Sequence, residues 1–180
     1  MSNIQLVRLD PALEHTLTND DEFKKALVQG NWVGMADVVH RVVGRTVAST
    51  SNVDELRWDG YFVVDEGTRE LVGSCAFKKP PTDEGMVEIA YFTYPEFEGR
   101  GYATAMARKL VDLASRSAAV KQVVAHTLPE TNASTRVLEK VGMVFAGEVM
   151  DPDDGRVWRW QVDVGSSPAR MTGHRVVSKS

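Results

Sequence analysis

The stretch from Gly99 to Thr104 has the residue types that a phosphate-binding turn needs. Glycines at 99 and 101 let the backbone turn tightly with no side chain in the way. A strongly periodic helical segment follows, so unpaired N–H groups point out of its first turn, where the helix dipole adds positive charge. Such a helix start suits a phosphate or pyrophosphate without a lysine or a metal. The spacing matches neither a Walker A loop nor a dinucleotide fingerprint, and by itself it also fits an ordinary strand-to-helix turn.

Glu88 is the best candidate for a general base. Strand alternation places Glu88, Ala90 and Phe92 on one face, and partial burial would raise the pKa of the carboxyl and suit it to act through a water. The carboxylate could instead pair with a cation across the sheet. His126 is either a second base or a packed strand histidine, and Tyr91 falls on the face opposite Glu88, so we do not nominate it as catalytic.

The elements expected to position these residues follow from hydrophobic periodicity and turn residues. The expected helices are Glu22–Val28, Gly34–Ala48, a short turn at Asn52–Trp58, a helix from Ala103 to Ala114, and Ala133–Val141 closed by Gly142. The expected strands are Ile4–Leu9, Tyr61–Asp65, Leu71–Lys78, Met86–Thr93, Val120–Leu128, Met143–Met150 and Val157–Val164. This order predicts an α/β fold, a mixed sheet with helices on both faces.

The chain length of 180 residues predicts a single domain over residues 1–165 and a basic tail over 166–180. The net charge of −4 gives no electrostatic support for nucleic-acid binding. No apolar run approaches the roughly 18 residues of a membrane helix, and the N-terminus does not resemble a signal peptide. The lone Cys75, expected to be a small buried hydrophobe, fits a reducing cytosol, so we expect a cytoplasmic protein. With one cysteine and four scattered histidines, no metal site is expected.

Two separate motifs carry a family resemblance. Glu98-Gly99-Arg100-Gly101-Tyr102-Ala103 resembles the acyl-CoA pyrophosphate loop of the GNAT acetyltransferase superfamily, directly after a segment, Val87–Glu96, that resembles its fourth strand. Leu128–Met143 looks like the fourth helix of that family, and is similar to the branch containing the ribosomal-protein N-terminal acetyltransferases. The resemblance is dense over Val63–Val164 and only topological before it. It implies a mostly antiparallel central sheet flanked by helices and splayed between its fourth and fifth strands.

The resemblance also implies roles for individual residues. Phe92 and Thr93 would pair with the pantetheine amides, although simple sheet pairing also explains them. Asn132 would bond the pantetheine arm and the Ser134 hydroxyl would lie near the thioester sulfur; the alternatives are a helix N-cap and a polar first-turn residue. The CoA pyrophosphate would be held by the backbone amides of Gly99, Arg100, Gly101, Tyr102, Ala103 and Thr104.

The chain departs from the family pattern at three positions. Glu98 stands where Arg or Gln is usual, and because a carboxylate would repel the pyrophosphate we expect its side chain to turn away. Leu138 stands where many relatives have a tyrosine that protonates the departing thiolate, so Ser134 or a water must serve, or the thiolate leaves unaided. Many relatives place Asn three residues before the serine, where this chain has Thr131.

The resemblance implies an N-acetyltransferase with acetyl-CoA as co-substrate and no metal. The acetyl group would pass to a primary amine by direct attack in a ternary complex, with Glu88 and Ser134 as the catalytic residues. The acceptor would be a protein N-terminus or a small-molecule amine, with Trp32, Trp58 and Tyr61 either walling its pocket or packing in the core. We expect a monomer or homodimer with no nucleic-acid or membrane partner. The alternative is a non-catalytic module that binds or senses acyl-CoA.

Overall fold

A computed structural model describes residues 3–9, 11–29, 37–39, 41–42 and 58–165. Its strands are β1 (Ile4–Arg8), β2 (Gly60–Asp65), β3 (Leu71–Phe77), β4 (Met86–Thr93), β5 (Gln122–Thr127), β6 (Val144–Asp151) and β7 (Gly155–Asp163). Its helices are α1 (Pro11–Asn19), α2 (Asp21–Val28), α4 (Tyr102–Ser115) and α5 (Ala133–Lys140), with a 3₁₀ turn at Pro95–Phe97.

All seven expected strands and the helices corresponding to α2, α4 and α5 are confirmed, with small differences at their ends. Helix α1 was not expected, because Asp10-Pro11 was interpreted only as the end of a strand. Proline is also favoured at the first helical position, where its missing N–H costs nothing, and Leu13 and Leu17 then lie one turn apart on the buried face. Of the expected helix Gly34–Ala48 only residues 37–39 and 41–42 are described, and these are helical. Trp32, the segment 52–57 and the basic tail lie outside the described residues.

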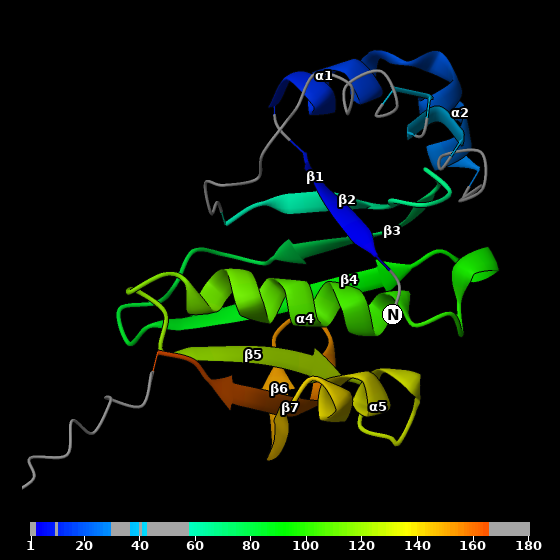
Figure 1. The fold of residues 1–180 in the computed structure, drawn as a ribbon. Helices are drawn as coiled ribbons and strands as arrows, with labels where there is room; N and C mark the ends of the chain where they lie inside the picture. The colour runs from blue at the N-terminus through cyan, green and yellow to red at the C-terminus, as the bar shows by residue number, and fades with distance from the viewer. Residues whose placement is uncertain (1–2, 10, 30–36, 40, 43–57, 166–180) are drawn as a thin grey trace, which may run out of the picture.

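The seven strands form one sheet in the order β1-β2-β3-β4-β5-β7-β6. Every neighbouring pair is antiparallel except β4 and β5, which run parallel because α4 connects them as a crossover. The fold is therefore the expected mixed, mostly antiparallel sheet. Helices α4 and α5 lie side by side in front of it in Figure 1, while α1 and α2 gather at the β1 end.

The two faces of the sheet bury two separate apolar clusters, because successive strand residues point to opposite faces. In β1, Ile4 and Leu6 join the larger cluster, where Met106 and Leu110 of α4 are fully buried. Val7, the next residue after Leu6, points to the other face and joins the smaller cluster with Leu13, Leu17 and residues from β2 and β3. No helix in the described part of the chain is long and apolar enough to cross a membrane.

Gly73 of β3 generates a prediction about stability. A Cβ at this position would lie 2.2 Å from the carbonyl oxygen of Phe92 and 2.7 Å from Cε of Met106. We expect Gly73→Ala to lower the free energy of unfolding by about 1–3 kcal/mol, because strand and helix must move apart. Gly60→Ala, where the added Cβ meets nothing within 4 Å, is the control. Equal losses for both variants in urea unfolding would contradict this account of the packing.

Candidate active site at the opening between β4 and β5

The parallel pairing of β4 and β5 ends well before the strands do. Their registered pairs are Met86–Gln122, Val87–Val123 and Glu88–Val124, and none follows. On its other edge β4 stays bonded to β3: the N–H of Lys78 donates to the Glu88 carbonyl, and the N–H of Tyr94 donates to the Val72 carbonyl. The backbone N–H and C=O groups of the even-numbered residues of β4 therefore point toward β3. By alternation, the backbone groups of Tyr91 and Thr93 face the opening.

Thr93 has a second feature at this opening. Its hydroxyl oxygen is the one buried side-chain polar atom in the described part of the chain that has no hydrogen-bond partner. Leaving a buried hydroxyl unpaired costs about 1–3 kcal/mol. An orphaned polar group here fits a site that is completed by a polar ligand.

The start of α4 lies at the same end of the sheet and leaves its first backbone amides without a side-chain cap. Gly99 and Gly101 both have positive φ, at 73° and 88°, and Gly101 is the N-cap residue with no side chain capping the helix. The first-turn amides are thus left to an outside acceptor. A pocket of about 380 Å³ beside them is lined by Gly101, Thr104, one acidic residue, Asp112, and the cationic residues Arg100, Arg108, Lys109 and Lys140.

The residues around this turn are held firmly. The Tyr102 hydroxyl donates to Asp65 Oδ2 at 2.9 Å, which ties the first residue of α4 to the end of β2. The Arg100 guanidinium lies over the Phe97 ring, 5.4 Å from its centroid. Glu98 is exposed and does not line the pocket, as expected for a carboxylate that must not face a phosphate.

Helix α5 begins beside the opening, on the face that carries α4. Asn132 is its N-cap: Oδ1 accepts from the backbone N–H of Ser134 at 2.9 Å and of Thr135 at 3.2 Å, and the Thr135 hydroxyl accepts from the Asn132 N–H at 3.1 Å. The capping interpretation is therefore confirmed. A contact between Asn132 and CoA stays a prediction, for which its amide Nδ2 is the available group.

A phenol reaches this helix start from β4. The Tyr91 hydroxyl lies 3.5 Å from the backbone oxygen of Ser134, and burial raises the pKa of Tyr91 to about 12. Tyr91 lies on the face opposite Glu88, as the alternation predicted. Leu138, at the position of the missing family tyrosine, is fully buried.

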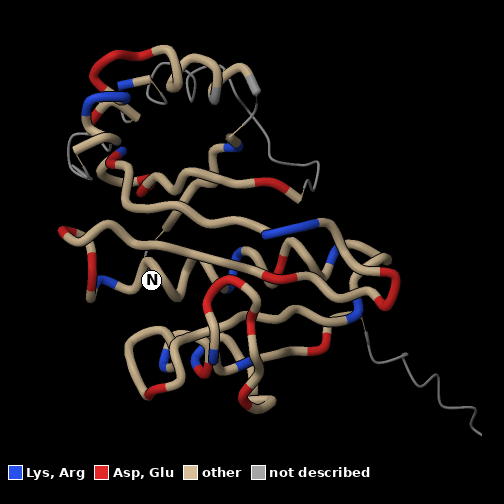
Figure 2. The backbone as a smooth tube through the Cα atoms, turned by 180° about the vertical axis from the view of Figure 1, so that it is seen from behind, with Lys and Arg blue, Asp and Glu red and all other residues tan. Residues whose placement is uncertain are grey.

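Three ionisable side chains meet on the other face of the opening. Glu88 Oε1 lies 2.7 Å from Lys78 Nζ and 2.9 Å from His126 Nδ1. Glu88 and His126 are about one-fifth exposed at most, and the hydrogen bond to Glu88 raises the pKa of Lys78. Seen from behind in Figure 2, the acidic β6–β7 turn lies near the basic end of β3, which Lys78 follows. Asp151 and Asp154 of this turn act on Lys78 electrostatically.

The cross-sheet cation considered for Glu88 is thus Lys78, which sequence reasoning did not name. A turn centred on Asp83 places Lys78 opposite Glu88, so the hairpin register was the available signal. When the Nδ1–H of a neutral His126 donates to Glu88, Nε2 keeps its lone pair as a proton acceptor. Within the described part of the chain no hydrogen-bond partner holds that Nε2.

The remaining sequence expectations concern buried residues. Cys75 is buried, and desolvation raises the pKa of its thiol to about 12, so the expectation of an inert small hydrophobe is confirmed. Tyr61 is buried in the core, and Trp58 packs edge-on against Phe77 at 5.1 Å.

A model of the acetyltransferase (GNAT) domain family matches residues 4–144. A curated relative, the uncharacterized N-acetyltransferase YjdG of Bacillus subtilis (strain 168), is 29% identical over 88 residues, which are 49% of this chain and 52% of the relative. The chain thus matches about half the length of that relative.

Two solved structures share the fold. One is the ribosomal-protein acetyltransferase RimL with coenzyme A, at a TM-score of 0.58 and 15% identity over 91% of this chain and 96% of that chain. The other is the spermidine/spermine N-acetyltransferase SpeG of Vibrio cholerae, at a TM-score of 0.56 and 14% identity over 89% and 93%.

The capping box of α5 allows the two roles of Asn132 to be separated. Asn132→Ala should lower the free energy of unfolding by about 1 kcal/mol, whereas Asn132→Ser keeps a capping oxygen and should cost only a few tenths. If the Asn132 amide also contacts CoA, both variants should weaken CoA binding in calorimetry. A serine variant as unstable as the alanine variant would contradict the capping role.

Proposed function

Because the chain belongs to the acetyltransferase (GNAT) family, we propose that it is an acetyl-CoA-dependent N-acetyltransferase acting on a primary amine, either a protein N-terminus or a small molecule. One observation carries this proposal. The sheet opens between β4 and β5 with the Glu88, His126 and Lys78 side chains on one face and two helix N-termini on the other.

The α4 side of the opening is proposed to hold acetyl-CoA, which supplies the acetyl thioester. The first-turn amides from Gly99 to Thr104 would bind its pyrophosphate, and the surrounding cations add charge of the right sign. The backbone groups of Tyr91 and Thr93 would pair with the pantetheine amides as a short added strand. The ring of Phe92 then lies on the acceptor side of the sheet.

The other face is proposed to activate the amine. An alkylamine is mostly protonated near pH 7, so a base must take a proton before the nitrogen can attack. Glu88 would serve with His126, directly or through a water, while Lys78 fixes the carboxylate. The amine nitrogen then forms a bond to the acetyl carbon as the carbon–sulfur bond breaks, and the departing sulfur takes up a proton.

The leaving sulfur would lie at the start of α5. The family resemblance implies that the Ser134 hydroxyl lies near this sulfur. The Tyr91 hydroxyl, which lies close to the Ser134 backbone oxygen, is a second protonated group. A CoA thiolate is a tolerable leaving group near neutral pH, since an ordinary thiol has a pKa of about 8.5. We propose that one of these two hydroxyls protonates the sulfur in place of the family tyrosine, which for Tyr91 departs from the sequence-based expectation that it is not catalytic.

The test is release of free thiol from acetyl-CoA with a panel of amines and peptides, for which buried Cys75 adds little background. We expect Glu88→Gln to lower kcat by about 10²–10⁴-fold while the Kd for acetyl-CoA is unchanged. His126→Gln should do the same, and the double variant should lose little more because the pair acts as a unit.

Glu148→Gln is the matched control, because Glu148 pairs only with Arg156 on the β6–β7 hairpin in the described part of the chain. Its kcat should equal that of the wild type. Undiminished acetyl transfer by Glu88→Gln would support the acetyltransferase activity but contradict the role of Glu88 as the base. Tight CoA binding with no transfer to any amine would favour the binding module.

A further inference from the structure

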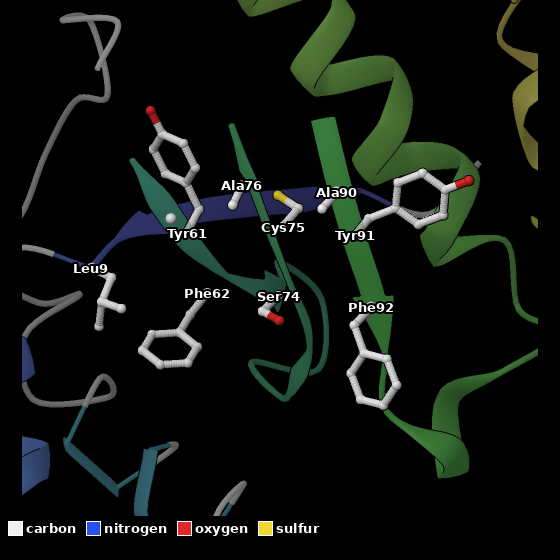
Figure 3. A pocket seen from close by; sticks show the side chains of 10 residues that line it. Leu9, Tyr61, Phe62, Ser74, Cys75, Ala76, Ala90, Tyr91 and Phe92 are labelled. Atoms are coloured by element: carbon white, nitrogen blue, oxygen red, sulfur yellow. The ribbon is translucent and has the colours of Figure 1, made fainter. Parts of the chain in front are cut away.

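A depression of about 360 Å³ lies over β2, β3 and β4 (Figure 3). Its shape follows from two rows of paired residues across the three strands. One row is Gly60, Ala76 and Ala90, and the next is Phe62, Ser74 and Phe92. The small residues leave the space, and Figure 3 shows the two phenylalanine rings on the same side of the sheet, with Leu9 nearby.

The depression is apolar on the face that holds Glu88. None of the described residues that line it carries a charge, and Ser74 supplies the only hydroxyl of the two rows. Phe92 is 44% exposed although it lies at the centre of the sheet. An apolar group placed here would leave water at a gain of about 25 cal/mol per Å² of buried surface, whereas an ammonium group would lose hydration with no charged partner among the described lining residues.

The position of the depression relates it to the proposed chemistry. Ala90 and Glu88 are two residues apart on one face of β4, so they lie about 7 Å from each other. Lys78, just past the end of β3, follows Ala76 in the same way, so the charged row borders the row of small residues. A nitrogen beside Glu88 and His126 would therefore have the apolar floor within about 7 Å.

We propose that the acceptor is a primary amine with a bulky apolar group, such as an aromatic ring, within about 7 Å of its nitrogen. This rests on the proposed acetyltransferase function and adds the substrate class. An arylalkylamine and a peptide with an aromatic N-terminal residue both have this chemistry. A polyamine does not, and so the chain is expected to differ from its spermidine-acetylating structural neighbour.

The experiment compares kcat/KM of the whole chain for phenethylamine, ethylamine and spermidine, and for two peptides that begin with Phe or Ser. We expect phenethylamine to exceed ethylamine and spermidine by at least about tenfold, as pocket filling commonly gives. A kcat/KM for the Phe peptide above that for phenethylamine indicates a peptide acceptor, and the reverse order indicates a small-molecule acceptor. Spermidine as good as phenethylamine would overturn the proposal and leave the acetyltransferase function standing.

A pocket-filling variant tests the same site. Ala90→Val should raise KM for phenethylamine about tenfold while KM for ethylamine and the Kd for acetyl-CoA stay unchanged. Ala146→Val, on the exposed edge strand β6, is the matched control and should change none of these. An equal effect of Ala90→Val on both amines would contradict the proposed placement of the ring.

A binding measurement covers the case of an unstable variant or of an inactive wild type. The methyl resonances of Ala76 and Ala90 in the wild-type protein with CoA are followed by NMR as phenethylamine or spermidine is added. Shifts with phenethylamine alone support the apolar site even where no acetyl transfer occurs, in which case only the proposed function fails. No shift with phenethylamine overturns the inference.

Discussion

The early end of the β4–β5 pairing is the constraint on which the rest of the site depends. Each backbone group left unpaired in a buried place costs about 1–3 kcal/mol, so the strands stay apart only because other contacts hold them. β4 stays bonded to β3 as far as Tyr94, and β5 stays paired with β7 as far as Thr127. The indole N–H of Trp160 donates to the Thr127 hydroxyl at 3.2 Å and secures that end of β5. The sheet therefore presents a gap whose two edge strands are each bonded to the neighbouring strand on their far side.

This gap joins two faces that the strand alternation keeps chemically distinct. Toward α4 and α5 lie amide-rich helix starts, basic side chains and the Tyr91 hydroxyl. Toward the other face lie the Glu88 cluster and the apolar depression. In the proposed reaction an anionic, extended co-substrate and an amine approach from opposite sides and meet only at the gap. The same alternation that builds two apolar clusters thus separates the two binding sites.

Local signals in the sequence were sufficient for most of the elements. Strand β4 and helix α4 were predicted within one residue because periodicity and turn residues agree there. Helix α1 was missed because a proline such as Pro11 can mark either the end of a strand or the first residue of a helix. The capping role of Asn132 was an alternative that the sequence already contained.

Contacts between distant strands were harder to predict. Lys78 opposite Glu88 follows from a local hairpin, but His126 beside Glu88 depends on the parallel register of Glu88 with Val124. That register is set by the long crossover through α4 between Thr93 and Gln122, for which single-sequence patterns have no signal. The gap itself was expected only from the family resemblance, because nothing local in β4 or β5 marks where their pairing ends.

The most direct test of the account is amide hydrogen exchange measured by NMR with and without CoA. The N–H groups of Tyr91 and Thr93 face the gap, whereas those of Ala90 and Phe92 bond to β3 in the same strand. The account predicts that CoA slows exchange at Tyr91 and Thr93 by about fivefold and changes Ala90 and Phe92 little, because one net hydrogen bond is worth about 1 kcal/mol. Uniform protection along β4, or none at Tyr91 and Thr93 while CoA is bound, would contradict the central role of the gap.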